Sequence, residues 1–262
     1  MSFARLISRQ HEAQRRFGRA LPAVQGRVVV VRGGPSGGTI ASAMATFEAM
    51  GRDPAVARIM ADPFALTPGF HGPAQPDGRG AVYDDLAEAW SAPFMMATIN
   101  TKNVHRTNAL AGHPWGRDFQ YDERLLTGPG RAGHWRARQL ARMDRVQSLL
   151  LGFGPTRALL GRWALPQPGQ GPSARQRETG HYQLSFSGRH SDGQVLRAKV
   201  TGDRDPGYGS TSKMIAEGAM CLLHDVDRTM TPGGVWTPGA AMGLALVRRL
   251  RDKAGLTFDI EA

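Results

Sequence analysis

The chain has 262 residues, of which 41% are hydrophobic and 21% charged, and these proportions are ordinary for a globular protein with a proper core. Its net charge of +11 attracts anions only nonspecifically, and the arginines are scattered among acids rather than massed with aromatic residues, which argues against a nucleic-acid-binding protein. The single cysteine, Cys221, excludes an internal disulfide framework and fits a reducing cytosol.

No signal peptide and no run of about 18 apolar residues can be found, so the sequence predicts a cytoplasmic protein without a transmembrane segment. The Arg-rich pattern over 1–25 predicts an amphipathic helix. The continuous apolar run over 26–34 closes on glycines and predicts a buried strand. The next expected elements are helices over 37–51, 53–62 and 91–112, a strand over 119–126, and a long basic helix over 132–163 with a break at 154–155.

Capping residues in the first half of the chain indicate where two helices begin. Thr39 is a possible N-cap of the helix over 37–51, whereas Asp53 followed by Pro54 marks the start of the next helix. A linker over 166–173 is rich in Pro and Gly.

Beyond the linker, two alternating runs flank Asp192-Gly193 and predict an antiparallel hairpin with one buried face. The remaining predicted elements are helices over 210–223 and 238–253 with a Gly/Pro turn at 230–239 between them, and a strand over 256–260. Together they predict an α+β or mixed α/β fold, a mixed sheet flanked by helices.

Two glycine-rich loops follow predicted strands and precede predicted helices. In GDRDPGYGSTSKM (202–214), Tyr208 stands where a P-loop needs its lysine, and Ser212 stands at the third glycine of a dinucleotide fingerprint. The strand before this loop belongs to a hairpin, so no βαβ unit surrounds it. In RGGPSGGT (32–39), Pro35 falls on the second glycine of that fingerprint. Neither loop therefore predicts a nucleotide cradle.

What remains at both junctions is a set of backbone N–H groups and hydroxyls at a helix N-terminus, which suits an anion or a polarised carbonyl. The alternative is that the glycines only permit tight turns and close helix packing. The candidate binding residues are Ser36, Thr39, Gly207, Gly209, Ser210 and Thr211. No HExxH, CxxC or histidine pair with a partner acid occurs, so no metal site is predicted.

The run INTKNVHRTNAL carries polar residues that helix propensity does not favour. Asn100, Asn103 and Thr107 are poor residues for a helix interior, and Arg106 lies among them. A helix that keeps these residues is expected to line a polar cleft, with a solvated helix face as the alternative.

Several long blocks stand in an order that is familiar from one family. They are GGPSGGTIASAMATFEAM, ADPFAL, SAPFMMATINTKNVHRTNAL, PGQGPSARQRETG and VTGDRDPGYGSTSKMIAEGAMCLL, with GGVWTPGAAMG and AGLTFDI after them. The chain resembles, from about Gly26 to its end, the saccharopine dehydrogenase-like oxidoreductases, in particular the branch that includes trans-acting enoyl reductases. Members of that family begin with a Rossmann domain, and no such domain can be recognised in this sequence.

The resemblance therefore implies a substrate-binding and dimerisation-type domain over 26–262, with 1–25 as the link to a missing Rossmann domain. NAD(P) would be held by that missing half, and the chain alone would be the substrate-binding part of an NAD(P)-dependent oxidoreductase, inactive by itself. The alternative is a non-catalytic binding or scaffold protein that retains the fold. The expected partners are a small-molecule or lipid-like substrate and either a second copy or a separate Rossmann domain, with self-association when the chain is expressed alone.

The resemblance also assigns roles to candidate residues. Asn100, Asn103, Arg106 and Tyr208 are expected to face substrate or nicotinamide. In that role Tyr208 would donate a proton and Arg106 would hold an anionic group. The alternative for Tyr208 is a core or hinge aromatic residue.

Overall fold

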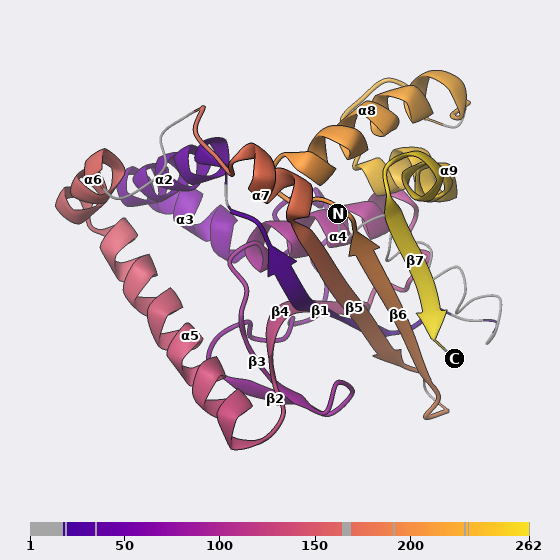
Figure 1. Cartoon of the computed structure of the whole chain (residues 1–262). Helices are drawn as coiled ribbons and strands as arrows, with labels where there is room; N and C mark the ends of the chain where they lie inside the picture. The colour runs from indigo at the N-terminus through magenta and orange to yellow at the C-terminus, as the bar shows by residue number, and fades with distance from the viewer. Residues whose placement is uncertain are drawn as a thin grey trace.

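A single mixed sheet organises the protein. The computed structural model describes residues 18, 20–34, 36–163, 169–190, 192–227, 229 and 231–261. Within these ranges seven strands form one open sheet in the order β2-β3-β4-β1-β5-β6-β7 (Figure 1). The prediction of a mixed α/β fold with helices flanking a mixed sheet is confirmed.

The sheet is mixed because its two central strands run parallel and the other neighbours run antiparallel. The parallel pair is β1 with β4. The strands are β1 (Ala23–Arg32), β2 (Val82–Asp84), β3 (Ala89–Pro93), β4 (Gln120–Gly128), β5 (His181–Arg189), β6 (Val195–Gly202) and β7 (Leu256–Glu261). The predicted hairpin is β5 with β6, paired in register from Tyr182 opposite Gly202 to Arg189 opposite Val195.

Helices surround the sheet on both sides and at one end. They are α2 (Gly37–Arg52), α3 (Pro54–Ala61), α4 (Ala97–Leu110), α5 (Gly130–Gly152), α6 (Gly154–Trp163), α7 (Ala174–Thr179), α8 (Gly209–His224) and α9 (Pro238–Lys253). In Figure 1 the long helix α5 runs along the left side of the sheet, α2 and α6 gather at its upper end, and α8 and α9 lie at the right beside β7.

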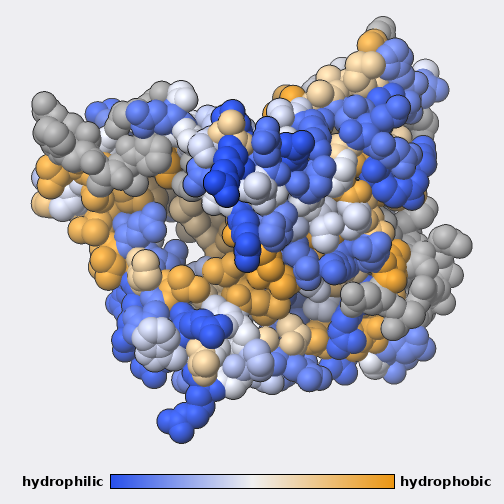
Figure 2. Space-filling view, viewed as in Figure 1, coloured by the Kyte–Doolittle hydropathy of each residue, from blue (hydrophilic) through white to orange (hydrophobic). Residues whose placement is uncertain are grey.

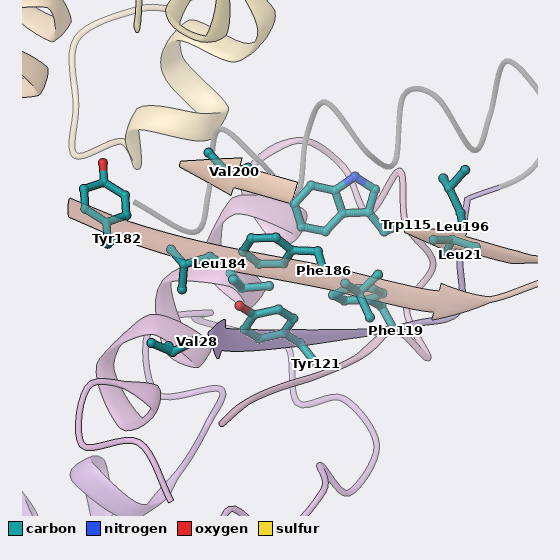
Figure 3. Close-up of a cluster of buried hydrophobic side chains, with 12 residues drawn as sticks. Leu21, Val28, Trp115, Phe119, Tyr121, Tyr182, Leu184, Phe186, Leu196 and Val200 are labelled. Carbon is teal, nitrogen blue, oxygen red and sulfur yellow. The ribbon is translucent and has the colours of Figure 1, made fainter. Parts of the chain in front are cut away.

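The main core lies on one face of the sheet. Alternate side chains of the central strands pack there against Val104 of α4 and against Trp115 and Phe119 from the loop that follows α4 (Figure 3). The other members of this cluster are Leu21, Val24, Val28, Tyr121, Tyr182, Leu184, Phe186, Leu196 and Val200. Each such side chain contributes about 2 kcal/mol when fully buried. The buried face predicted for the hairpin is confirmed.

A second, smaller core joins α8, α9 and β7. Cys221 is completely buried there among Leu246, Leu250 and Leu256. Burial raises the pKa of the Cys221 thiol, and nearby Asp225 raises it further. Cys221 is therefore a core residue, as its place in an apolar helical run indicates.

Residues 91–112 are not one helix, as the sequence predicts, but a strand and a shorter helix. The segment Ala89–Pro93 pairs with β4 as β3, and α4 begins only at Ala97. Pro93 explains the difference, because the residue before a proline is disfavoured in the helical conformation. The short elements β2 and α7 were also not predicted, since three and six residues are too few to show a period.

Two predictions about the start of the chain, the extent of the first helix and the N-cap of α2, differ from the structure. The helix expected over 1–25 cannot extend that far, because Ala23 to Gln25 already belong to β1; residues 1–17 lie outside the described part. The N-cap of α2 is Ser36 and not Thr39, since the Ser36 hydroxyl accepts a hydrogen bond from the Thr39 amide at 3.1 Å.

The sheet face opposite the main core is polar, and the β2–β3 hairpin folds across it. Arg27 of β1 is buried between Asp84, which accepts from its Nε, and Asp122, whose Oδ2 lies 3.1 Å from Nη1. Burial raises the pKa of Asp122, while the charge of Arg27 opposes that rise. At the turn of the hairpin, the Leu86 carbonyl accepts from Arg197 of β6 at 3.1 Å. This network fixes the hairpin to the central strands.

Candidate functional site

The loop between β6 and α8 is organised by one buried carboxylate. Asp205 is completely buried, and its side chain accepts three backbone hydrogen bonds, from Gly207 at 2.9 Å, Tyr208 at 3.0 Å and Gly209 at 2.8 Å. A negative charge at the N-terminus of a helix is also favoured by the helix dipole. The three amide groups that a bound anion would use are therefore occupied by the protein itself. The expectation that these N–H groups are available is wrong.

Glycines let other segments approach Asp205 closely. A Cβ atom on Gly33 would lie 2.8 Å from the Asp205 Cβ, and one on Gly180 would lie 2.5 Å from it. Gly33 also has a positive φ of 146°, which an L side chain rarely adopts. The two glycine-rich junctions thus meet around Asp205, and the interpretation that their glycines serve close packing is supported at these positions.

The junction before α2 is closed in a similar way. The Thr39 amide donates to the Ser36 hydroxyl, which also lies 2.9 Å from the Thr39 hydroxyl. The Gly37 amide donates to the Gln170 carbonyl at 2.8 Å. Two amides are therefore committed at this junction and three more to Asp205, so these five N–H groups are not available to an anion.

An open pocket of about 370 Å³ lies beside the closed loop, at the start of α8. Its lining residues come from α7, from the end of β6 and from the first turn of α8: Ala174, Arg177, Glu178, Arg204, Tyr208, Gly209, Ser212 and Lys213. Tyr208 is 38% exposed, and within the described part of the chain its hydroxyl has no hydrogen-bond partner. A Cβ on Gly171 would lie 2.4 Å from the Tyr208 ring, so this linker glycine makes room for the ring.

The charges of this pocket, which we call the Tyr208 pocket, are mainly positive. Lys213 is neutralised by Asp203, with its Nζ 2.9 Å from both carboxylate oxygens. Arg177 donates from Nη1 to the Pro172 carbonyl at 3.1 Å, and no acid pairs with it among the described residues. Arg204 has no hydrogen-bond partner there either. The two guanidinium groups are thus able to bind a carboxylate or a phosphate beside the Tyr208 hydroxyl.

Two predicted hydroxyls near Tyr208 point away from the Tyr208 pocket. Ser210 is completely buried, and its Oγ lies 2.9 Å from the Tyr182 hydroxyl. Thr211 donates to the Pro206 carbonyl at 2.7 Å. Of the residues predicted in this loop, Tyr208 and Gly209 therefore line the pocket, whereas Gly207 belongs to the closed loop around Asp205.

The predicted residues of α4 bind other parts of the chain. Asn100 donates to Glu123 of β4 at 2.6 Å, and Asn103 donates to the Ile99 carbonyl at 3.1 Å. The guanidinium of Arg106 donates to two backbone carbonyls, Leu66 at 2.7 Å and Val235 at 2.8 Å. None of the three lines the Tyr208 pocket. Their contact with a substrate stays a prediction.

Sequence reasoning missed four residues of this site. They are Asp205, which closes the loop, Arg177 and Arg204, which supply the positive charge of the Tyr208 pocket, and Lys213, which lines the pocket and pairs with Asp203. An aspartate two and four residues before glycines is a signal for a carboxylate that binds its own loop. Arg177 could not be assigned from the sequence, because only the fold brings α7 to the start of α8.

The described residues form neither a metal site nor a membrane-spanning helix. Within the described ranges, no group of three or more His, Cys, Asp or Glu side chains is placed to hold a metal ion. Over those ranges the helices are also too short or too polar for any of them to span a bilayer.

Comparison with known proteins finds mycobacterial relatives. The chain is 35% identical over 241 residues to a Mycobacterium tuberculosis protein named "Putative trans-acting enoyl reductase Rv2449c", with 84% of this chain and 55% of that protein aligned. It is 34% identical to the trans-acting enoyl reductase of Mycobacterium bovis and 32% identical to that of Mycobacterium ulcerans, with 82% of this chain and 54% of each relative aligned.

No protein-family profile matches the chain, and no solved structure matches it. The chain spans about half the length of the curated relatives it matches. Over 82–84% of its own length it is homologous to proteins named trans-acting enoyl reductases.

Proposed function

We propose that the chain is the substrate-binding part of an NAD(P)-dependent oxidoreductase of the enoyl reductase kind, similar to the saccharopine dehydrogenase-like proteins. The names of its relatives support an oxidoreductase that acts on an enoyl group. The observation that carries the proposal for this chain is the Tyr208 pocket, where an exposed phenol lies beside two arginines without acidic partners.

The Tyr208 pocket is suited to the proton-transfer step of an enoyl reduction. Reduction of an enoyl double bond adds a hydride equivalent to one carbon and a proton to the other. We assign Tyr208 to donate that proton or to hydrogen-bond the carbonyl oxygen conjugated with the double bond. Arg177 and Arg204 would hold an anionic group elsewhere on the substrate. The backbone of Tyr208 is held by Asp205, which would keep the phenol in place.

In this proposal the nicotinamide nucleotide is not bound by either glycine loop. Five amide groups of the two glycine loops are committed to protein acceptors, those of Gly37, Thr39 and the three that bind Asp205, which argues against a pyrophosphate site there. We therefore propose that residues outside the described part, or a separate domain, supply NAD(P)H. The chain alone would then bind substrate without reducing it.

Calorimetric titration of the purified chain tests this proposal. The probes are NADPH, NADH and the phosphopantetheine thioester of trans-2-decenoic acid, whose phosphate supplies the anionic group that Arg177 and Arg204 would hold. We expect the thioester to bind and neither nucleotide to saturate. Tyr208→Phe should weaken thioester binding about tenfold, the loss of one hydrogen bond in a site. Tyr83→Phe, a change at another exposed tyrosine, is the matched control and should leave binding unchanged.

Three results would contradict the proposal in different ways. Saturable micromolar binding of NADPH by the purified chain would mean that the chain itself holds the cofactor. Consumption of NADPH by the chain alone in the presence of the thioester would mean that it is a complete reductase. Thioester binding that Tyr208→Phe and Tyr83→Phe leave equally unchanged would remove the Tyr208 pocket from the substrate site.

A further inference from the structure

Helix α5 is apolar on two opposite sides. One side packs on β3 and β4 and buries Gly133, Ala137 and Leu151. The other side carries large hydrophobic side chains that remain exposed. They are Trp135, Met143, Val146, Leu149 and Leu150, with Phe153 at the end of α5 and Leu159 on α6, and their exposed fractions lie between 40% and 67%.

Most of these exposed side chains form a stripe from Met143 to Phe153, and Trp135 lies on the same side of the helix about two turns earlier. At 3.6 residues per turn, the positions from Trp135 to Phe153 fall within about a third of the helix circumference. Figure 2 shows hydrophobic residues gathered at the left edge of the molecule, where α5 meets α6. An exposed apolar surface of this extent is unusual for a protein that has no partner there. We call it the α5 stripe.

Arginines lie at one edge of the α5 stripe. Arg131, Arg138, Arg142 and Arg145 are all exposed; the same helical spacing places Arg138 and Arg145 just outside the apolar arc and Arg131 and Arg142 just inside it. The only acid in α5, Asp144, falls on the opposite side of the helix. An apolar stripe edged by arginines, with aromatic residues toward both ends, is typical of helices that lie in a membrane interface.

We propose that the α5 stripe binds the surface of an anionic lipid bilayer. The apolar side chains would enter the headgroup boundary, and the four arginines would lie against lipid phosphates. Charge complementarity favours this occupant. The proposal is independent of the chemistry assigned to the Tyr208 pocket.

The same arginines disfavour a second copy of the chain as the occupant. A two-fold contact presents the same surface from both subunits. Two copies facing each other through the α5 stripe would therefore bring eight arginines together, with no acid of α5 on that side to neutralise them. An anionic bilayer removes this repulsion and gains from each positive charge.

Flotation of the purified chain with lipid vesicles tests the proposal. We compare vesicles of phosphatidylcholine alone with vesicles that also contain phosphatidylglycerol. The chain should bind the anionic vesicles at least about tenfold more tightly, and added salt should weaken this binding. The double change Arg138→Gln and Arg142→Gln should reduce binding to the level seen with phosphatidylcholine.

A matched pair of variants tests the apolar part. Leu149→Glu places a charge in the α5 stripe, whereas Leu223→Glu makes the same change on α8 at nearly the same exposure, 67% against 66%. Leu149→Glu should lower binding to anionic vesicles about tenfold more than Leu223→Glu does. Circular dichroism of both variants establishes that they are folded.

Two outcomes would overturn the proposal. The first is equal binding by both glutamate variants, or no binding of the unchanged protein to anionic vesicles. The second is a dimer in lipid-free solution that Leu149→Glu converts to a monomer while Leu223→Glu does not. That result, read by sedimentation velocity, would assign the α5 stripe to a second copy of the chain.

Discussion

The loop around Asp205 and the outer side of α5 differ in how completely the protein satisfies its own groups. At the loop, the carboxylate and three amides are paired, and glycines bring the neighbouring backbone close. On α5, large apolar side chains lie exposed beside exposed arginines for which the described residues provide no acidic partner. The glycine-rich loop resembles a ligand site in sequence, but three of its amide groups are already paired within the protein. Helix α5 resembles an ordinary surface helix in sequence, but its outer side leaves apolar side chains and arginines available for a partner.

The difference also explains where the Tyr208 pocket lies. Tyr208 has its amide in the closed loop and its phenol outside it. A rigid backbone that presents an exposed functional group is the arrangement that a binding site requires. The closed loop is thus a support for a site and not the site itself.

The largest predicted effect is the loss of the carboxylate in that loop. Asp205→Ala leaves three amide groups without their acceptor, and we expect the free energy of unfolding to fall by about 4 kcal/mol. Urea unfolding measures this change. Asp192→Ala, which removes one such hydrogen bond and a 3.1 Å contact with His190 from an exposed turn, is the control and should cost far less. Equal losses in the two variants would mean that Asp205 does not organise the loop.

His105 is the opposite case, a buried polar group that is not satisfied. Among the described residues its Nε2 has no hydrogen-bond partner, and the centroid of its ring lies 4.4 Å from that of the Phe64 ring. Burial lowers the pKa of His105 from 6.5 to about 4. In the unfolded chain the imidazole takes up a proton below about pH 6.5, whereas in the folded protein it stays neutral down to about pH 4.

The stability that His105 contributes is therefore present above pH 6.5 and is lost as the pH falls toward 4. The loss approaches about 3 kcal/mol, from the size of the pKa shift. Urea unfolding of the unchanged protein and of His105→Leu, each at neutral and acidic pH, measures it. The variant should lose correspondingly less stability on acidification. Parallel pH profiles for the two proteins would show that the histidine is not the cause.

Arg106 separates a structural role from a binding role. Its guanidinium joins the loop at Leu66 to the turn at Val235. Arg106→Met should lower the free energy of unfolding by about 2 kcal/mol, because two hydrogen bonds from a charged group are lost. If Arg106 only joins the two loops, binding of the enoyl thioester by the folded variant should stay unchanged. A selective loss of binding at unchanged stability would instead support the role predicted for Arg106 from the sequence.

Regular elements could be predicted because their patterns are local. The alternation at Tyr182, Leu184 and Phe186 predicted one buried strand face, and that face is buried. The site could be predicted only in part. Tyr208 was found from its own loop, but Arg177 reaches the pocket through the packing of α7 on α8, which no local pattern encodes. The hydrogen-bond partners of the loop amides could not be predicted from the sequence either. A glycine-rich loop has the same sequence pattern whether its N–H groups bind a ligand or a carboxylate of the protein such as Asp205.

The N-cap of α2 shows the same limit at the smallest scale. Ser36 and Thr39 both suit the position by residue type, and only the backbone of the structure shows that Ser36 occupies it. Ser36→Ala should therefore lower the free energy of unfolding by about 1 kcal/mol. Thr39→Ala keeps the bond from the Thr39 amide to Ser36, and it gains helix propensity while it loses the contact between the two hydroxyls, so it should change the free energy of unfolding by only about a few tenths of a kcal/mol. Thermal unfolding of the two variants measures the difference. The reverse order would restore Thr39 as the cap, as the sequence predicts.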